Sequence, residues 1–207
     1  MNPTSFAAVL AALLLSLTLG ACQRRRAVPE IPKLEERRDR AFYEGTPRMQ
    51  EELRVLFSQA SQTTGTERAQ VGQRILSYGE VARPLLIEKL SDEDAAMRVF
   101  AAWLLGVSDD TRAIEPLDGL RADPDEAVRF EAATAMVRLG DSRGLETLVD
   151  GLSHTDPRVR NRSIRQLELA TGDAFGYRSD DHRDERDAAI RRWRAWILER
   201  NERSELR

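Results

Sequence analysis

The stretch that decides the fold is DPDEAVRFEAATAMVRLGDSRGLETLVDGL, residues 123–152. It opens on Asp123 and Pro124, a pair typical of a helix start. Aspartate accepts hydrogen bonds from free backbone N–H groups, and proline has the backbone angle of a first helical residue. Glu126 lies where a capping box places an acidic residue. We therefore predict a helix that begins here, with Asp123 as its N-cap.

Apolar residues recur at helical spacing through the rest of this stretch and form two stripes. The first stripe comprises Val128, Ala132, Ala135, Met136 and Leu139, and the second comprises Leu145, Leu148, Val149 and Leu152. Gly140 lies between them, and glycine commonly ends a helix. Neither helix can bury its stripe alone, so each pair is expected to stack on another pair.

The same pattern recurs along the chain as an internal repeat. Arg98, Arg129 and Arg160 lie 31 residues apart, each at the end of a segment that begins with aspartate: DEDAAMR (92–98), DPDEAVR (123–129) and DPRVR (156–160). Second helices are expected over Glu80–Leu90, Arg112–Leu120 and Arg143–Leu152. The sequence therefore predicts an all-α fold, an α-solenoid of stacked antiparallel helix pairs.

These segments resemble HEAT repeats, in particular the short bacterial units called lyase-type HEAT-like repeats, over residues 67–170. The shared patterns are DP...VR..A in the first helix and AI.PL...L in the second. The resemblance implies that Arg98, Arg129 and Arg160 bond to aspartates and backbone groups of adjoining units. The alternative is that this arginine ladder grips an acidic partner. One unit departs from the pattern, and we expect its first helix to stop before Gly106.

An N-terminal helix is predicted to cover the first repeat. Thr46 and Pro47 are expected to begin it, as N-cap and first helical residue. Its apolar face comprises Met49, Leu53, Leu56, Phe57 and Ala60. We place the whole repeat domain at residues 46–202.

Residues 171–202 are predicted to form a C-terminal cap with a capping helix. An aromatic loop, Thr171–Tyr177, precedes a helix over Glu185–Trp196, in which Ala189, Trp193, Trp196 and Ile197 share one face. This segment is similar to the closing segment of many bacterial HEAT-repeat proteins, and terminal repeats need such a cover. The alternative is an aromatic binding patch made of Phe175, Tyr177, Trp193 and Trp196.

The first 22 residues are predicted to be a lipoprotein signal peptide. The apolar run FAAVLAALLLSLTL, residues 6–19, is too short to span a bilayer and has the length of a signal core. It ends in LGAC, which resembles a bacterial lipobox, and this resemblance implies lipidation of Cys22. Against export, MNPTS contains no basic residue, whereas three arginines follow Cys22. We favour the lipobox and interpret residues 23–45 as a tether, with Pro29 and Pro32.

Composition excludes several function classes. The 35 acidic and 32 basic residues nearly balance, so we expect no nucleic-acid binding. A single cysteine excludes an internal disulfide. Motifs for phosphate-binding loops, zinc proteases and nucleophile elbows are missing from the sequence, so we expect no catalytic residues and no cofactor. A loop with Asp180, Asp181, His182 and Asp184 matches no known metal spacing, and its arginines favour a solvated loop.

The sequence therefore favours a membrane-anchored, non-catalytic scaffold or adaptor of the bacterial cell envelope, which binds an unidentified protein or peptide. The lipobox resemblance implies a lipid anchor on Cys22. Because Gln23 follows in place of the aspartate that retains some lipoproteins, the resemblance also implies the periplasmic face of the outer membrane in a Gram-negative cell. The alternative is an accessory or catalytic protein related to HEAT-like chromophore lyases. A purely structural envelope protein is a third hypothesis.

Overall fold

The computed structural model describes residues 45–205, which lie within one compact unit, Ala41–Arg207. The predicted signal peptide, with Cys22, and the predicted tether up to residue 44 lie outside the described residues. The described part is all-helical and contains no strand.

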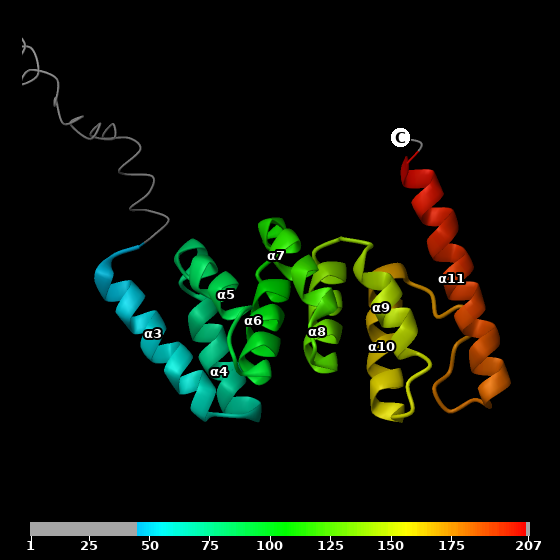
Figure 1. Ribbon diagram of the computed structural model, residues 1–207, viewed down its shortest axis with the longest axis horizontal. Helices are drawn as coiled ribbons and strands as arrows, with labels where there is room; N and C mark the ends of the chain where they lie inside the picture. The colour runs from blue at the N-terminus through cyan, green and yellow to red at the C-terminus, as the bar shows by residue number, and fades with distance from the viewer. Residues whose placement is uncertain (1–44, 206–207) are drawn as a thin grey trace, which may run out of the picture. The chain divides into compact units, whose positions relative to one another are not determined.

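The helices follow one another in the order that the repeat predicts (Figure 1). Four of them are first helices of a pair: α4 (Gly65–Leu76), α6 (Ala95–Val107), α8 (Glu126–Arg138) and α10 (Pro157–Thr171). The second position is filled by η1 (Gly79–Val81) with α5 (Arg83–Lys89), by η2 (Thr111–Ala113), α7 (Ile114–Asp118) and η3 (Gly119–Ala122), and by α9 (Gly144–Gly151). Capping helices are α3 (Pro47–Gln62) and α11 (Arg183–Glu205).

Packing between neighbours confirms the predicted α-solenoid of stacked helix pairs. Both predicted stripes of residues 123–152 are buried, and so are Leu53, Leu56, Phe57 and Ala60 of α3. The buried residues form two clusters, one from α3 to α8 and the other from α8 to α11. Because α8 contributes to both clusters, the stack is held together through shared helices and has no single central core.

The start of α8 corrects one prediction. Asp125, and not Asp123, is its N-cap, since the Asp125 carboxylate accepts hydrogen bonds from the backbone N–H groups of Ala127 (2.8 Å) and Val128 (3.2 Å). Pro124 therefore precedes the helix. Asp123 is engaged elsewhere: its carboxylate accepts hydrogen bonds from Arg98 and from the N–H of Asp125.

The end of α6 corrects a second prediction. This helix does not stop before Gly106 but continues to Val107. Gly106 lies against α8, where a Cβ atom would come within 2.6 Å of the Ala135 Cβ and 2.7 Å of the Ala135 Cα. The glycine is thus explained by close helix packing. Gly140, in contrast, does end α8: it has φ +89°, and the N–H of Asp141 donates back to the Met136 carbonyl (2.9 Å).

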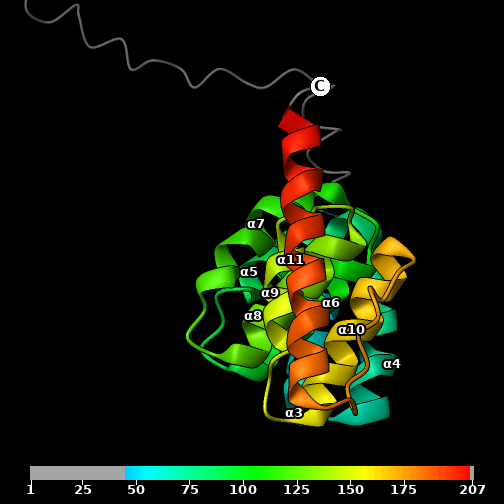
Figure 2. The ribbon, with the colours of Figure 1, turned by 90° about the vertical axis from the view of Figure 1, so that its right-hand side faces the viewer.

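The C-terminal helix α11 covers the end of the stack formed by α9 and α10 (Figure 2). It is longer than the predicted Glu185–Trp196, and its buried residues include Ala189, Trp193 and Ile197. The buried Tyr177 hydroxyl donates to the Leu152 carbonyl (2.5 Å) and so joins the preceding loop to the end of α9. These contacts agree with a cap.

Candidate functional site

Arg98 joins two successive repeats. Its Nε and Nη2 atoms donate to the Asp123 carboxylate at 2.9 and 2.8 Å, and its Nη1 donates to the backbone carbonyls of Asp92 and Glu93. The hydrogen bonds from Arg98 hold the pKa of Asp123 below its usual value. The guanidinium is therefore occupied by the protein itself.

The other two arginines of the ladder bond to backbone carbonyls of loops. Arg129 donates to the carbonyls of Asp123 (2.7 Å) and Pro124 (3.1 Å), and Arg160 donates to those of His154, Thr155 and Ser179. The position 31 residues after Asp123 is His154, so Arg129 meets no equivalent carboxylate there. All three arginines bond to backbone carbonyls of the loop before their helix, and only Arg98 also binds an aspartate of the adjoining repeat, so the expected aspartate contact is found for Arg98 alone.

The four aromatic residues of the C-terminal segment pack as one cluster. Phe175 meets Trp193 edge-on with ring centroids 4.6 Å apart, and Trp193 meets Trp196 at 5.9 Å. Trp193 and Tyr177 are buried, whereas Phe175 and Trp196 are partly exposed. A partner could therefore reach the edge of this cluster only at Phe175 and Trp196.

A second series of ion pairs connects the second helices of successive repeats. Asp110 binds Arg112 (2.8 Å) and Arg83 (2.8 Å), and Arg112 and Arg83 also pair with Glu80. One repeat later, Arg143 pairs with Asp141 (2.7 Å), Glu115 (2.9 Å) and Asp118 (3.2 Å).

These pairs lower the pKa of the two aspartates, Asp110 and Asp141. Arg112, followed by Arg83, holds the pKa of Asp110 far below its usual value, and Arg143 lowers the pKa of Asp141. Such networks fix how repeats stack. They were not predicted from the sequence, although Asp110 and Arg112 recur 31 residues later as Asp141 and Arg143.

A groove of about 320 Å³ runs across the first helices of several repeats, and we call it the α4–α10 groove. Its lining combines apolar, aromatic and charged side chains from four helices: Gly65, Arg68, Ala69, Ala96, Val99, Phe100, Trp103, Glu131 and Arg162. Val99 and Trp103 are partly exposed. Because four different helices supply the lining, the groove exists only when the repeats are stacked.

Repeat-equivalent positions meet in this groove. Ala69, Phe100, Glu131 and Arg162 are spaced by 31 residues, and all four line it. The sequence did not predict them as site residues, because the residue type at this position changes from repeat to repeat. The available signal was a glutamate at a position where the preceding repeats have alanine and phenylalanine.

Glu131 is the one charged residue of the groove that is almost completely buried, with 2% of its surface exposed. Its Oε2 atom pairs with Arg162. Its Oε1 atom is buried and has no hydrogen-bond partner among the described residues. A buried carboxylate oxygen without a donor is costly, so this atom requires an explanation.

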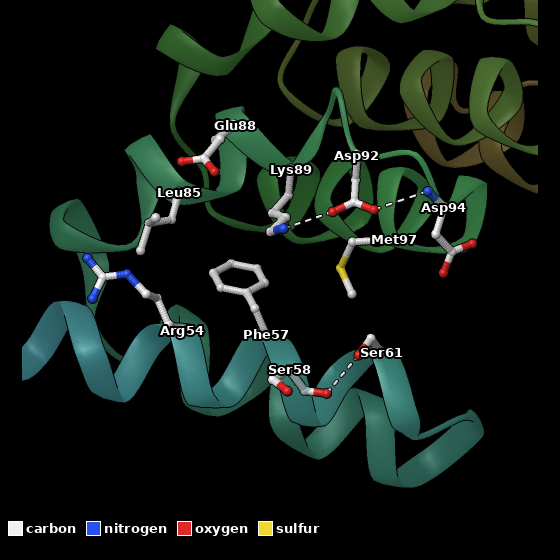
Figure 3. A pocket seen from close by; sticks show the side chains of 10 residues that line it. All are labelled: Arg54, Phe57, Ser58, Ser61, Leu85, Glu88, Lys89, Asp92, Asp94 and Met97. Atoms are coloured by element: carbon white, nitrogen blue, oxygen red, sulfur yellow. Dashed lines mark hydrogen bonds and ion pairs between the residues drawn. The ribbon is translucent and has the colours of Figure 1, made fainter.

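A second groove, of about 480 Å³, separates α3 from α5 and the start of α6 (Figure 3). Phe57, Leu85 and Met97 face one another across it. The side chains of Lys89 and Asp92 on its rim pair with each other at 2.8 Å, and Phe57 and Met97 are buried. No buried polar side-chain atom of this groove lacks a hydrogen-bond partner among the described residues, so it offers less to a ligand than the α4–α10 groove.

Within residues 45–205, no group of three potential metal ligands lies together. The side chains of Asp180, His182 and Asp184 are exposed, and Asp181 is partly exposed. No helix of this part of the chain is both long and apolar enough to cross a membrane.

The fold is an α-solenoid of HEAT-like repeats, because antiparallel helix pairs stack one on another and a capping helix covers each end. Residues 81–169 match the family model described as HEAT repeats, a stretch that runs from η1 into α10. No curated protein matches the chain significantly. Repeats of this family generally mediate interactions between proteins.

Proposed function

We propose that this chain is a non-catalytic scaffold of the bacterial cell envelope, which is lipid-anchored through Cys22 and binds a protein segment in the α4–α10 groove. The observation that supports binding is the groove itself, which several repeats build together. Extended repeat surfaces bind proteins by offering area rather than a deep pocket.

The composition of the groove suits a protein segment as occupant. Trp103, Val99 and Phe100 provide apolar surface, while Arg68, Arg162 and Glu131 provide polar groups for orientation. This mixture of aromatic and arginine side chains is typical of residues that dominate binding between proteins. The Arg68 guanidinium already lies 6.0 Å from the Phe100 ring centroid, so one side of the groove is organised before a partner arrives.

Site-specific photo-crosslinking in cells tests the binding proposal. A photoreactive benzoyl-phenylalanine replaces Val99 in the groove or, as control, Glu115 on α7, whose side chain is 80% exposed. We expect one discrete adduct from position 99 and none from position 115, with loss of the adduct when Trp103→Ala is added. The partner is then identified by mass spectrometry and its affinity measured with purified proteins. Equal adducts at both positions, or none at position 99, would contradict a role for this groove.

Metabolic labelling with a radioactive fatty acid tests the anchor separately. We expect label on the wild-type chain, none on Cys22→Ala, and movement of Cys22→Ala from the membrane fraction to the soluble fraction after osmotic lysis. An unlabelled wild-type chain would refute lipidation and leave the groove proposal standing. The proposed envelope location would then need other support.

A further inference from the structure

The unpaired oxygen of Glu131 points to the chemistry of the groove's ligand. Glu131 lies on α8 at a position where α4 has Ala69 and α6 has Phe100. An apolar side chain can be buried there at no cost in free energy. A buried carboxylate oxygen that accepts no hydrogen bond has lost its hydration without compensation, which destabilises the fold. Arg162 compensates only Oε2. The missing element at Oε1 is a hydrogen-bond donor.

The surrounding charges limit what this donor can be. Glu131 and Arg162 form a pair with no net charge, and Arg68 adds one positive charge to the lining. A cationic ligand would meet the net positive charge of the lining, and a carboxylate or phosphate anion would offer no hydrogen-bond donor to Glu131 Oε1. A neutral donor avoids both penalties.

The apolar part of the groove adds a second requirement. Phe100 and Trp103 lie with ring centroids 6.0 Å apart and their planes inclined by 33°, and Val99 lies beside them in the lining. Aromatic side chains prefer aromatic neighbours at such distances, and a buried tryptophan N–H or tyrosine O–H needs an acceptor. Glu131, whose Oε1 is a buried acceptor without a donor, lines the same groove as these rings.

We infer that the α4–α10 groove binds a neutral aromatic donor side chain, a tryptophan or tyrosine of the protein partner, whose N–H or O–H donates to Glu131 Oε1. The ring packs against Phe100 and Trp103. Arg162 has a long side chain that is 49% exposed, so it is the part of the wall that can yield to the ring. This inference rests on the proposed function, because it specifies the residue by which the partner enters the groove.

A matched pair of probes tests the donor directly: N-acetyl-tryptophanamide and its 1-methylindole analogue, which has nearly the same shape and lacks the N–H. The full chain in detergent, with ¹⁵N-labelled tryptophan side chains, is titrated with each probe at measured free concentrations. The indole N–H resonance of Trp103, assigned with Trp103→Phe, reports binding. We expect saturable shifts, with the parent probe binding at least about tenfold more tightly because hydrogen bonds to charged acceptors are the stronger ones.

Glu131→Gln supplies the second measurement. Arg162 is expected to hold the amide oxygen, so the amide N–H₂ group occupies the place of Oε1 and accepts no hydrogen bond. The two probes should then bind equally to this variant, whereas Glu146→Gln on the exposed face of α9 should keep the tenfold difference. If Glu131→Gln does not fold, the wild-type comparison alone decides.

Three results would overturn the inference: equal affinities of the two probes for the wild type, no saturable shift with either probe, or tighter binding of N-acetyl-argininamide than of the tryptophan probe. None of these results bears on the crosslink from position 99. A partner captured there with an indifferent probe pair would retain the scaffold proposal and remove the aromatic donor. If the probes differ as expected but position 99 captures no partner, the inferred chemistry of the groove stands and the proposed protein partner is refuted.

Discussion

Gly106→Ala is expected to destabilise the protein, although alanine is the better helix former. The new Cβ would lie 2.6 Å from the Ala135 Cβ and 2.7 Å from the Ala135 Cα. A backbone atom cannot rotate away, so α6 and α8 must separate. Overpacking of this kind costs about 1–3 kcal/mol, and the helical preference for alanine returns about 1 kcal/mol. Since whole helices must move, we place the strain at the upper end and expect a net loss of about 1–2 kcal/mol.

The same substitution at Gly119 is the matched control. Gly119 is exposed, has φ −58° at the end of α7, and has open space where a Cβ would be added. Gly119→Ala is therefore expected to stabilise the chain by about 0.4–1 kcal/mol, through a less flexible unfolded state.

Urea unfolding followed by far-UV circular dichroism and by tryptophan fluorescence measures both changes. The two probes should give coincident transitions before a free energy is derived, because repeat arrays can unfold in parts. A Gly106→Ala variant as stable as the wild type would refute the close contact between α6 and α8. Adding Ala135→Gly to Gly106→Ala should restore part of the loss, since it removes one of the two atoms in conflict.

Three further predictions concern the arginine network. Arg98→Met should lower the urea midpoint more than Arg129→Met, because only Arg98 also binds a carboxylate, and equal midpoints would contradict a special role for Asp123. His154→Asp should raise the free energy of unfolding by about 1 kcal/mol, and with it the midpoint, because it gives Arg129 the carboxylate that Arg98 has, while the Asp156 N–H keeps an acceptor. An unchanged midpoint would show that Arg129 cannot reach the new carboxylate. Arg112 and Arg83 lower the pKa of Asp110, so its stabilisation is present above about pH 4 and is lost as the pH falls toward the folded pKa. Asp110→Asn should thus be less stable than the wild type at pH 7, and the difference should shrink below about pH 3 in unfolding curves; a constant difference would refute the ionic origin.

Periodicity was sufficient to predict the fold, because the spacing of apolar residues within each helix identifies the face that is buried. The stripes of α8 and α9 are buried as predicted, and so is the capping face of α3 except for Met49, which is partly buried. The errors came from residues whose role depends on another repeat. Asp123 has the chemistry of an N-cap, but Arg98 of the preceding repeat binds it, and Asp125 takes its place. Gly106 resembles a helix stop until α8 is placed against it.

The site was harder to predict than the fold for the same reason. Arg98, Arg129 and Arg160 were conspicuous because the same residue type recurs every 31 positions. In the structure they donate to loop carbonyls, and one of them also binds an aspartate of the adjoining repeat. Glu131 carries no motif. It lines the groove together with Phe100 and Arg162, which precede and follow it by 31 residues, and only the stacked structure reveals its unpaired oxygen.

This contrast suggests how to interpret repeats from one chain. A residue type that recurs at every 31st position is explained by the stacking that all repeats share, since the same contact is needed each time. Stacking does not explain a residue that differs from the equivalent residues of the other repeats and whose burial costs free energy. Glu131 breaks a series that is apolar in the two preceding repeats, and it does so in the groove that four helices line. If the carboxylate serves only stacking, Glu131→Leu should be less stable than the wild type, because the pair with Arg162 is lost, and should bind the crosslinked partner equally well. We expect instead a more stable protein with weakened partner binding, because the substitution removes an unsatisfied buried oxygen and, with it, the acceptor that the ligand requires.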